Sequence, residues 1–229
     1  MPGPRKALTL SPRLQAAADL IRPCQTVYDI GTDHAFLPAW LVENEICRNA
    51  VASDLRPGPL ERARANIARH GLADRIRAEL GDGLDALSPG PNDAVVLAGL
   101  GGLEIRRILT QAHPVSCQLI VQPMKTLPEL RQWLAAQGYA FCKETLAREK
   151  ERFYPVMKLR YDGRPRTLSE LEAYLGPCLL QDHPTDLADY AAVLLRRLQR
   201  QLRGQPELQD LAGQVARIAA KGALPSELE

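Results

Sequence analysis

Short apolar runs alternate along most of the chain with segments in which apolar residues recur every three or four positions. Short runs bounded by turn residues indicate strands, and the longer period indicates amphipathic helices. The runs predict strands over residues 26–30, 50–54, 75–80, 94–98, 117–122, 139–147 and 152–161. The periodic segments predict helices that begin after Ser11, span 35–44 and 59–70, follow Gly102, and span 126–137, where Thr126 and Glu129 have capping-box spacing.

This alternation predicts an α/β fold with a mostly parallel sheet that helices cover on both faces. Only the charged segment 148–151 separates the last two strands, so these form an antiparallel hairpin. A plain dinucleotide-binding fold does not need such an ending, whereas the class I methyltransferase fold has it. We therefore expect a Rossmann-like, seven-stranded class I methyltransferase sheet with a terminal antiparallel hairpin.

The chain changes character at residues 162–165, Asp-Gly-Arg-Pro, which predicts a boundary between a domain at 1–162 and a smaller domain at 163–229. Thr167 and Glu170 have capping-box spacing. Apolar residues then recur at helical spacing before and after Gly204-Gln205-Pro206, which predicts two antiparallel helices packed as a short coiled coil. Such a pair either stabilises the fold as a helical cap or serves a binding function.

The composition is that of a globular protein, with 45% hydrophobic and 24% charged residues among 229, which excludes a disordered or collagen-like chain. No apolar run approaches the roughly 20 residues that cross a bilayer, and no signal-like segment follows the first residues. We therefore expect a cytoplasmic protein without a membrane partner. The net charge of +2 argues against a protein that holds nucleic acid by bulk charge alone.

The five cysteines are dispersed and contain no Cys-x-x-Cys pair, and the four histidines are equally scattered. A disulfide scaffold would have a dense and even set, and a zinc site would cluster its ligands. We therefore predict reduced, buried thiols and no metal site.

Acidic and glycine residues follow the predicted parallel strands, at the sheet edge where such folds bind ligands. Asp29 and Asp33 flank Gly31 after the first strand, in place of the glycine fingerprint of a dinucleotide site. Carboxylates repel a pyrophosphate but attract an ammonium group, so this turn favours S-adenosylmethionine over NAD. Alternatively, Asp33 only caps the following helix.

The next strand ends extend this pattern. Asp54 is placed to accept hydrogen bonds from both ribose hydroxyls of a nucleoside, and Asp82, which precedes Gly83, can reach an adenine amino group. Residues 98–102, Ala-Gly-Leu-Gly-Gly, expose backbone beside the reacting centre and can admit a flat base.

Residues after the fifth strand and in the terminal hairpin are candidates for substrate contact. The amide of Gln122, which precedes Pro123, can read a base edge or orient the substrate, or else it satisfies nearby backbone groups. Tyr154 can stack on an extruded base, although an aromatic residue at such a position is more often part of the core.

Several of these motifs stand in one order: Ser-Pro-Arg-Leu at 11–14, Asp-Ile-Gly-Thr-Asp-His-Ala-Phe-Leu-Pro at 29–38, Gly-Asp-Gly at 81–83, Ala-Gly-Leu-Gly-Gly at 98–102 and Gln-Pro at 122–123. Together they resemble the bacterial tRNA (adenine-22-N1)-methyltransferase family. The resemblance implies S-adenosylmethionine as cofactor, tRNA as substrate and a C-terminal coiled coil that helps to hold it. The implied cofactor contacts are Arg13, Asp29, Gly31, Asp33, His34, Asp54, Asp82, Gly83 and Gly99.

On the substrate side the resemblance implies contacts from Leu100, Gly101, Gly102, Gln122 and Pro123, with Tyr154 beside them. The chain departs from the family pattern at Leu100, where the family commonly has Met, and at Met124, where it often has Asn. The first change conserves volume. The second removes an amide, so any role of that asparagine does not transfer to this chain.

Methylation of adenine N1 needs no enzyme base, because N1 already carries a lone pair, and it creates a positive ring. Catalysis therefore reduces to placing and desolvating the reactants, with Gln122 as a positioning candidate and Asp33 as a stabiliser of the developing cation. Alternatives are a methyltransferase of the same fold that acts on another RNA position or a small molecule, and an S-adenosylmethionine-binding module without turnover. The missing fingerprint disfavours an NAD-dependent oxidoreductase.

Exposing the target base costs a few kcal/mol, which phosphate contacts elsewhere on the tRNA can offset. The sequence offers two groups of cations for such contacts. One is the cluster Arg196, Arg197, Arg200 and Arg203 on a predicted helix, and the other is the N-terminal set Arg5, Lys6, Arg13 and Arg22. We expect the protein to act as a monomer.

Overall fold

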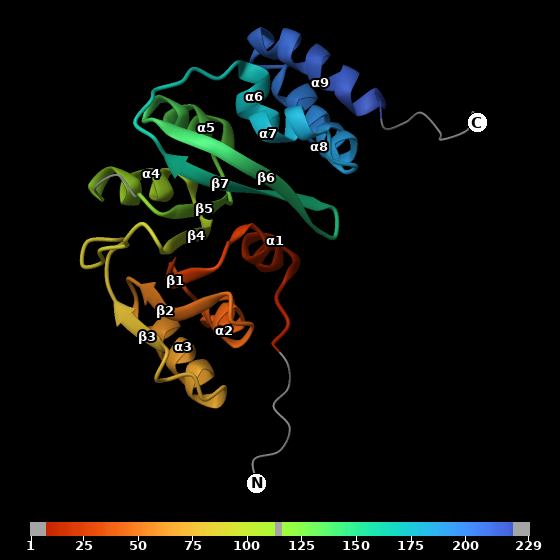
Figure 1. The fold of residues 1–229 in the computed structure, drawn as a ribbon. Coiled ribbons are helices and arrows are strands. Elements are labelled where there is room, and N and C mark those ends of the chain that lie inside the picture. Colours follow the sequence, from red (N-terminus) through yellow and green to blue (C-terminus); the bar gives the residue numbers. More distant parts are fainter. Residues whose placement is uncertain (1–7, 113–115, 222–229) are drawn as a thin grey trace.

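The computed structural model describes residues 8–112 and 116–221. Its centre is a seven-stranded sheet with the strand order β3-β2-β1-β4-β5-β7-β6, in which the first five strands are parallel and β7 runs antiparallel to both its neighbours (Figure 1). The strands are β1 Cys24–Ile30, β2 Cys47–Asp54, β3 Ile76–Leu80, β4 Ala94–Leu100, β5 Gln118–Pro123, β6 Tyr139–Glu149 and β7 Arg152–Tyr161. The predicted fold class is confirmed.

Helices cover the sheet on two faces. They are α1 Pro12–Leu20, α2 Phe36–Glu43, α3 Pro57–Arg69, α4 Gly102–Gln111 and α5 Leu127–Ala136. Alternate residues of β4 enter two separate cores: Val96 packs in the cluster that α1, α2 and α3 cover, and Val95 in the cluster beneath α4 and α5. The near-continuous apolar run of this strand therefore reflects burial on both faces.

The C-terminal part is a helical unit with a core of its own. It contains α6 Glu170–Leu175, α7 Pro177–Asp182, α8 Leu187–Gln201, the 3-10 turn η1 Pro206–Leu208 and α9 Gln209–Lys221. The predicted pair of helices is present as α8 and α9, which share the buried Leu194, Leu198 and Leu211. Leu146 and Phe153 of the β6–β7 hairpin pack against this core, so the helical unit rests on the hairpin (Figure 1).

The helix α5 begins directly after Thr126, as predicted, but the capping boxes predicted at residues 126–129 and 167–170 do not form. Thr126 makes no cap: it has a positive φ of 54°, and its hydroxyl donates to the carbonyl of Lys125 at 2.8 Å. The capping box of α6 is formed by Ser169 and Glu172, not by residues 167 and 170. The spacing of polar residues suggested both positions, but backbone geometry decides which side chain reaches a free N–H.

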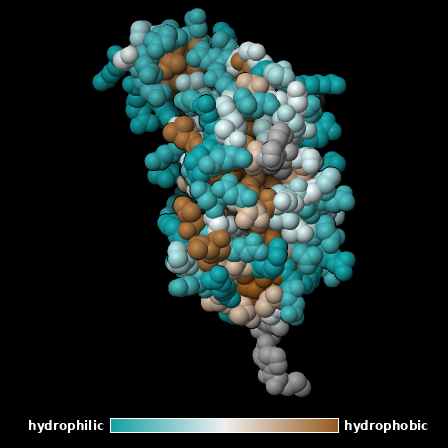
Figure 2. Space-filling model, turned by 90° about the vertical axis from the view of Figure 1, so that its left-hand side faces the viewer, coloured by the Kyte–Doolittle hydropathy of each residue, from teal (hydrophilic) through white to brown (hydrophobic). Residues whose placement is uncertain are grey.

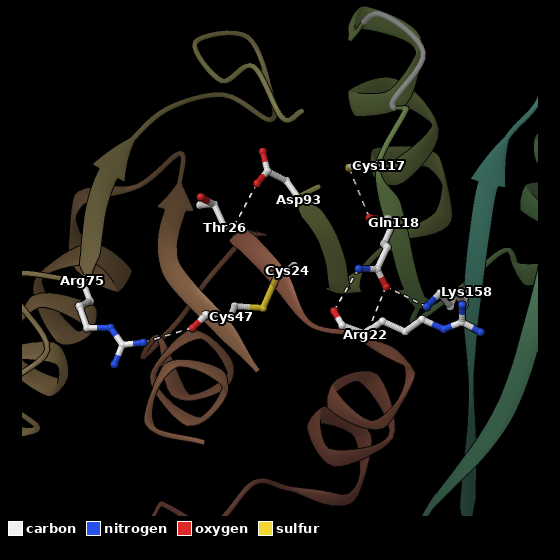
Figure 3. The surroundings of a disulfide bond; sticks show 9 residues. All are labelled: Arg22, Cys24, Thr26, Cys47, Arg75, Asp93, Cys117, Gln118 and Lys158. Carbon is white, nitrogen blue, oxygen red and sulfur yellow. Dashed lines mark hydrogen bonds between the residues drawn. A yellow bond between two sulfur atoms is a disulfide. The ribbon is translucent and has the colours of Figure 1, made fainter. Parts of the chain in front are cut away.

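The prediction of reduced, buried thiols is wrong for three of the five cysteines. Cys24 and Cys47 form a disulfide (Figure 3), and Cys142 is exposed, whereas Cys117 and Cys178 are free and buried. Cys24 and Cys47 are register partners at the starts of β1 and β2, with Cα atoms 4.7 Å apart. Parallel pairing of two distant strands creates this neighbourhood, so the sequence spacing carried no signal of it.

The surface matches that of a globular chain. Figure 2 shows one face that is mainly hydrophilic, with hydrophobic residues in several separate patches. None of the helices in the described ranges combines the length and the apolar character that crossing a membrane would require.

Candidate active site

A pocket of about 150 Å³ lies at the carboxyl ends of the parallel strands, beside the point where the strand order reverses between β1 and β4. Ligands of open α/β sheets bind at such a point. The pocket is lined by Ile30, Gly31, Asp54, Leu55, Arg56, Gly81, Asp82, Gly83, Leu100, Glu104 and Ile108. Of the predicted residues, the structure therefore brings together Gly31, Asp54, Asp82, Gly83 and Leu100, whereas Asp29, Asp33, His34 and Gly99 are not part of this lining.

Gly31 and Leu100, which both line this pocket, are in close contact. Gly31 has a φ of +81°, and a Cβ atom there would lie 2.8 Å from Cδ2 of Leu100. A side chain at position 31 would therefore strain the backbone and collide with Leu100. Gly83 is similarly constrained, with a φ of +61° and the side chain of Ile108 3.1 Å from a built Cβ. Both glycines therefore let a neighbouring side chain, Leu100 or Ile108, pack closely against the backbone of the pocket lining.

Asp29 is a buried acid near the end of β1, with 8% of its surface exposed. It does not line the pocket itself but directly precedes Ile30, which does. Burial raises the pKa of Asp29 to about 6, with a smaller upward contribution from the charge of Asp54, although a hydrogen bond from Thr32 lowers it. Desolvation penalises the ionised form. A cation that binds beside this carboxyl would restore its charge, so the environment suits an ammonium group.

Asp54 is the last residue of β2, and within the described residues its carboxylate accepts hydrogen bonds through only one of its two oxygen atoms. Its Oδ1 atom accepts from the backbone N–H of Arg56 at 2.8 Å and lies 3.4 Å from Nε of the same residue. The side chain of Asp54 is 8% exposed, whereas that of Arg56 is 75% exposed. Every hydrogen bond of the Asp54 side chain in the described structure uses Oδ1, so Oδ2 is left for a donor on a ligand.

Asp82 lies in the pocket but is already paired. Arg107 of α4 binds both carboxylate oxygens of Asp82 and also binds Glu104, one turn earlier on the same helix. The hydrogen bonds from Arg107 lower the pKa of Asp82. A ligand amino group would therefore share Asp82 with Arg107.

Asp33 lies outside the pocket lining. Its side chain is 64% exposed, forms an ion pair with Arg62 of α3 and lies 3.5 Å from Nε2 of His34. The ring of His34 stacks on Phe36, with centroids 5.1 Å apart. The helix-capping alternative is not present either, because Thr32, not Asp33, accepts the N–H of Ala35 before α2.

Gln122 is buried and its amide holds two strand ends together. Oε1 accepts the N–H of Gly99 at 3.1 Å, and Nε2 donates to the carbonyl of Pro123 at 3.0 Å. Gly99 has a φ of +77°, so the hydrogen bond from its N–H holds a left-handed backbone conformation that residues other than glycine rarely adopt. The alternative stated for Gln122, that it satisfies nearby backbone groups, is the arrangement in the structure.

Arg13 of α1 organises the edge of the site next to the hairpin. Its Nε donates to Glu149 at 3.2 Å, Nη1 lies 3.3 Å from Sδ of Met124, and its guanidinium lies 5.1 Å from the ring centroid of Tyr154. Met124 is 42% exposed. Because β7 begins beyond the end of β5 in the antiparallel register, the hairpin tip extends past the strand ends and brings Tyr154 toward them.

Gly102 allows the loops after β4 and β5 to meet. Its N–H donates to the carbonyl of Lys125 at 3.1 Å, and a Cβ atom on Gly102 would lie 2.5 Å from Oγ1 of Thr126. Gly101 has nothing within 4 Å of such an atom and leaves open space at the start of α4. The two glycines of this run therefore have different functions, one in packing and one in access.

Of the arginine cluster, Arg196, Arg197 and Arg200 lie on α8, within the helical unit, and Arg203 follows the end of that helix. Arg196, Arg200 and Arg203 line a shallow depression of about 620 Å³ together with Gln199. The three- and four-residue spacing places Arg196, Gln199 and Arg200 on one face of α8. Arg197 is exposed but not part of this lining. None of the four forms an ion pair with a residue in the described ranges. Arg5 and Lys6 lie outside the described residues.

Several lining residues were missed by sequence reasoning. Leu55 and Arg56 directly follow Asp54 and could have been included as the turn after β2. Glu104 and Ile108 are one turn apart on α4, and only the packing of that helix over the strand ends brings them to the pocket. Among the residues that the structure describes, no group of three His, Cys, Asp or Glu side chains is arranged to hold a metal ion.

Comparisons with known proteins agree with this geometry. Residues 10–157 match the family model described as a methyltransferase domain. The chain is 30% identical over 219 residues to the tRNA (adenine(22)-N(1))-methyltransferase of Bacillus subtilis, which covers 91% of this chain and 88% of that protein.

Solved structures give the same likeness over nearly the whole chain. A putative tRNA (m1A22) methyltransferase of Streptococcus pneumoniae, in complex with S-adenosyl-L-methionine, superposes with a TM-score of 0.82 at 27% identity and covers 92% of this chain and 100% of that chain. TrmK of M. capricolum, in complex with S-adenosyl-homocysteine, has a TM-score of 0.76 at 26% identity, with 92% and 98% of the two chains covered.

Proposed function

Since this chain belongs to the tRNA (adenine(22)-N(1))-methyltransferase family, we infer that it transfers a methyl group from S-adenosylmethionine to N1 of adenine 22 in tRNA. The observation that carries this inference is the likeness to the Bacillus subtilis enzyme over 91% of the chain. The acid-lined pocket at the strand reversal supplies an independent physical reason, because its residues suit the cofactor.

The cofactor-side residues have distinct proposed roles. Oδ2 of Asp54 accepts from the ribose hydroxyls, and the buried carboxyl of Asp29 attracts the ammonium group of the methionine moiety. Gly31 lets the ligand approach the backbone closely. The pocket volume of about 150 Å³ is below the roughly 300–1,000 Å³ of most ligand sites, so this pocket is proposed to hold only part of the cofactor.

Methyl transfer to adenine N1 requires little acid–base catalysis from the protein. When bound, S-adenosylmethionine supplies an electrophilic methyl group on its sulfonium. Adenine N1 already carries its lone pair, so the protein has to align N1 with that methyl group and exclude water. Gln122 acts here as a positioning residue, because it fixes the turn at Gly99 and the carbonyl of Pro123.

The substrate side is proposed to lie between the glycine run 99–102 and the hairpin. Leu100 and Gly101 border the space for the base, and Tyr154, held by Arg13, offers an aromatic surface beside it. The arginine cluster on α8 is proposed to contact tRNA phosphates, which makes residues 163–229 a substrate-holding domain next to the methyltransferase domain at 1–162. Such contacts offset the cost of unstacking the target base.

We also propose that the protein acts as a monomer in the cytoplasm. The disulfide between Cys24 and Cys47 makes that location testable, because cytosolic thiols are normally kept reduced. Size-exclusion chromatography with light scattering measures the oligomeric state, and thiol alkylation of protein taken directly from cells measures whether the two cysteines are joined there.

A transfer assay tests the function. The protein is incubated with S-adenosylmethionine that carries a labelled methyl group and with unmodified tRNA transcripts, and the digested nucleosides are analysed for labelled 1-methyladenosine. The proposal expects labelled 1-methyladenosine. Binding of the cofactor without any transfer would identify a binding module instead. The reason to test this alternative is Met124, because the family often has Asn at that position. In that case Met124→Asn would be the variant to assay for restored transfer.

A further inference from the structure

A second and larger cleft lies at the amino ends of the parallel strands, opposite the active site at their carboxyl ends. It has a volume of about 950 Å³ and is bordered by the C-terminal end of α1, the starts of β1 and β5, and the hairpin segments around Lys143 and Lys158. Figure 3 shows Arg22, Gln118 and Lys158 gathered there, near the disulfide. The methyl-transfer chemistry uses none of these residues.

Four cations line this cleft: Arg22, Lys143, Lys158 and Arg160. Lys143 and Lys158 are direct partners in the antiparallel ladder, and Arg160 follows Lys158 on the same strand face. Like charges placed directly opposite in a sheet are destabilising, so this pair has an energetic cost in the free protein. Asp19 is the one acid in the described lining, which leaves four positive charges against one negative charge.

The cations lack acidic partners within the described structure. No ion pair there involves Arg22, Lys143, Lys158 or Arg160. Asp19 instead accepts a hydrogen bond from Gln15 at 2.8 Å. Burial, and secondly the charge of Arg22, lower the pKa of Lys158. An anion in the cleft would relieve this repulsion.

Gln118 holds the cleft in a fixed arrangement. Its Oε1 atom accepts from the backbone N–H of Arg22 at 2.9 Å and from Nζ of Lys158 at 2.8 Å, and its Nε2 atom donates to the carbonyl of Arg22 at 3.0 Å. Nζ of Lys158 also donates to the carbonyl of Leu20 at the end of α1. Lys158 therefore has a structural function, whereas Arg22, Lys143 and Arg160 are exposed and available to a ligand.

We propose that this cleft binds a phosphate group of the RNA backbone and so forms a second anchor for the substrate, an inference that rests on the proposed function for the identity of the RNA. The helix α1 runs between the two sites, since Arg13 in its first turn lies at the active site and Arg22, two residues after its end, lies at the cleft. The nine residues of α1 span about 14 Å at 1.5 Å per residue. An RNA much longer than this distance can contact both sites at once.

The test uses the triple variant Arg22→Gln, Lys143→Gln and Arg160→Gln, which leaves Lys158 in place. A control triple, Arg48→Gln, Arg64→Gln and Arg77→Gln, removes the same charge from exposed positions outside the described cleft. The tRNA dissociation constant is measured for each at several salt concentrations. We expect the cleft variant to bind tRNA about tenfold more weakly than the control near physiological salt, with a slope of log K against log salt shallower by about 1–2.

Two further measurements separate the possible outcomes. The affinity for S-adenosylmethionine is expected to be unchanged in both triples. Equal tRNA affinity and slope in the two triples would overturn the proposal. If inorganic phosphate raises the Tm of the wild type but not of the cleft variant while tRNA affinity stays equal, the site takes a free phosphate and the RNA assignment is overturned. If the cleft variant binds tRNA more weakly than the control but the wild-type protein does not methylate adenine 22, the result supports the cleft as an RNA site and contradicts only the proposed function.

Discussion

Arg131 of α5 and Glu144 of β6 form an ion pair in which both side chains are completely buried, with Nη2 and Oε1 2.9 Å apart. Nη1 of Arg131 donates to the carbonyls of Ala173 and Tyr174, and Oε2 of Glu144 accepts the N–H of Cys178. The pair therefore joins the sheet to α6 and α7. Gly176, with a φ of +113°, fits there because a Cβ atom would lie 2.5 Å from Oε2 of Glu144.

Breaking this pair should destabilise the protein strongly. We expect Arg131→Met to lower the free energy of unfolding by about 3–5 kcal/mol, because it leaves a buried carboxylate without its partner. Urea denaturation followed by circular dichroism measures the change. Arg148→Met is the matched control: it breaks the exposed pair between Arg148 and Asp189, whose nitrogen and oxygen are 3.4 Å apart, at a cost of about 0–1 kcal/mol. Equal losses in the two variants would contradict this account.

Asp54 should matter more for cofactor affinity than Asp33. We expect Asp54→Asn to weaken binding of S-adenosylmethionine about ten- to a hundredfold, the loss typical for a hydrogen bond to a charged group. Isothermal titration calorimetry gives the dissociation constant. Asp33→Asn should change it little, since the side chain of Asp33 is 64% exposed and pairs with Arg62. A selective loss of turnover in Asp33→Asn would instead support Asp33 as the stabiliser of the developing cation.

The pKa of Asp29 makes a pH-dependent prediction about stability. Because burial raises the pKa of Asp29 from 3.8 to about 6, the folded chain binds this proton more tightly than the unfolded chain. The ionised carboxyl therefore costs stability above pH 6, and the cost disappears as the pH falls below about 4. A shift of about two units corresponds to about 3 kcal/mol. Asp29→Asn should thus stabilise the free protein by up to about 3 kcal/mol at pH 8, measured by urea denaturation, and by little at pH 4.

The same pKa predicts how cofactor affinity changes with pH. Only the ionised form of Asp29 attracts an ammonium group, so the dissociation constant for S-adenosylmethionine should rise about tenfold from pH 7 to pH 5. In Asp29→Asn the affinity should be weaker at pH 7 and nearly flat between these values. A wild-type affinity that does not respond to pH would remove Asp29 from the ammonium site.

The arginine cluster on α8 should contribute to tRNA binding through phosphates. We expect the triple variant Arg196→Gln, Arg197→Gln and Arg200→Gln to weaken tRNA binding and to reduce the slope of log K against log salt by about 2–3, one unit for each lost phosphate contact. Fluorescence anisotropy with labelled tRNA measures both quantities. An unchanged slope would favour the alternative that α8 and α9 only stabilise the fold.

The parts of the site that follow from the sheet order could be predicted from the sequence. Asp54 and Asp82 end neighbouring parallel strands, so their meeting at one pocket is a consequence of topology. Pairings between distant segments could not be predicted in this way. The ion pair between Asp82 and Arg107 depends on how α4 packs over the strand ends, and that between Asp33 and Arg62 depends on the packing of α3.

The role of a side chain could not be predicted where two interpretations suited the same residue. The amide of Gln122 suited a base edge or the backbone equally well in sequence, and only the positions of Gly99 and Pro123 distinguish them. The disulfide of Cys24 and Cys47 has the same origin as the missed ion pairs, since residues 23 positions apart become neighbours through strand pairing.

The position of the methyl group on tRNA tests the central claim most directly. A methyl group on N1 of adenine blocks Watson–Crick pairing, so reverse transcriptase stops beside it. After reaction of an unmodified tRNA transcript with the protein and S-adenosylmethionine, we predict a primer-extension stop at adenine 22, and no stop in a matched transcript with guanine at that position. A stop at another nucleotide, or methyl transfer that continues at full rate on the guanine-22 transcript, would contradict the account.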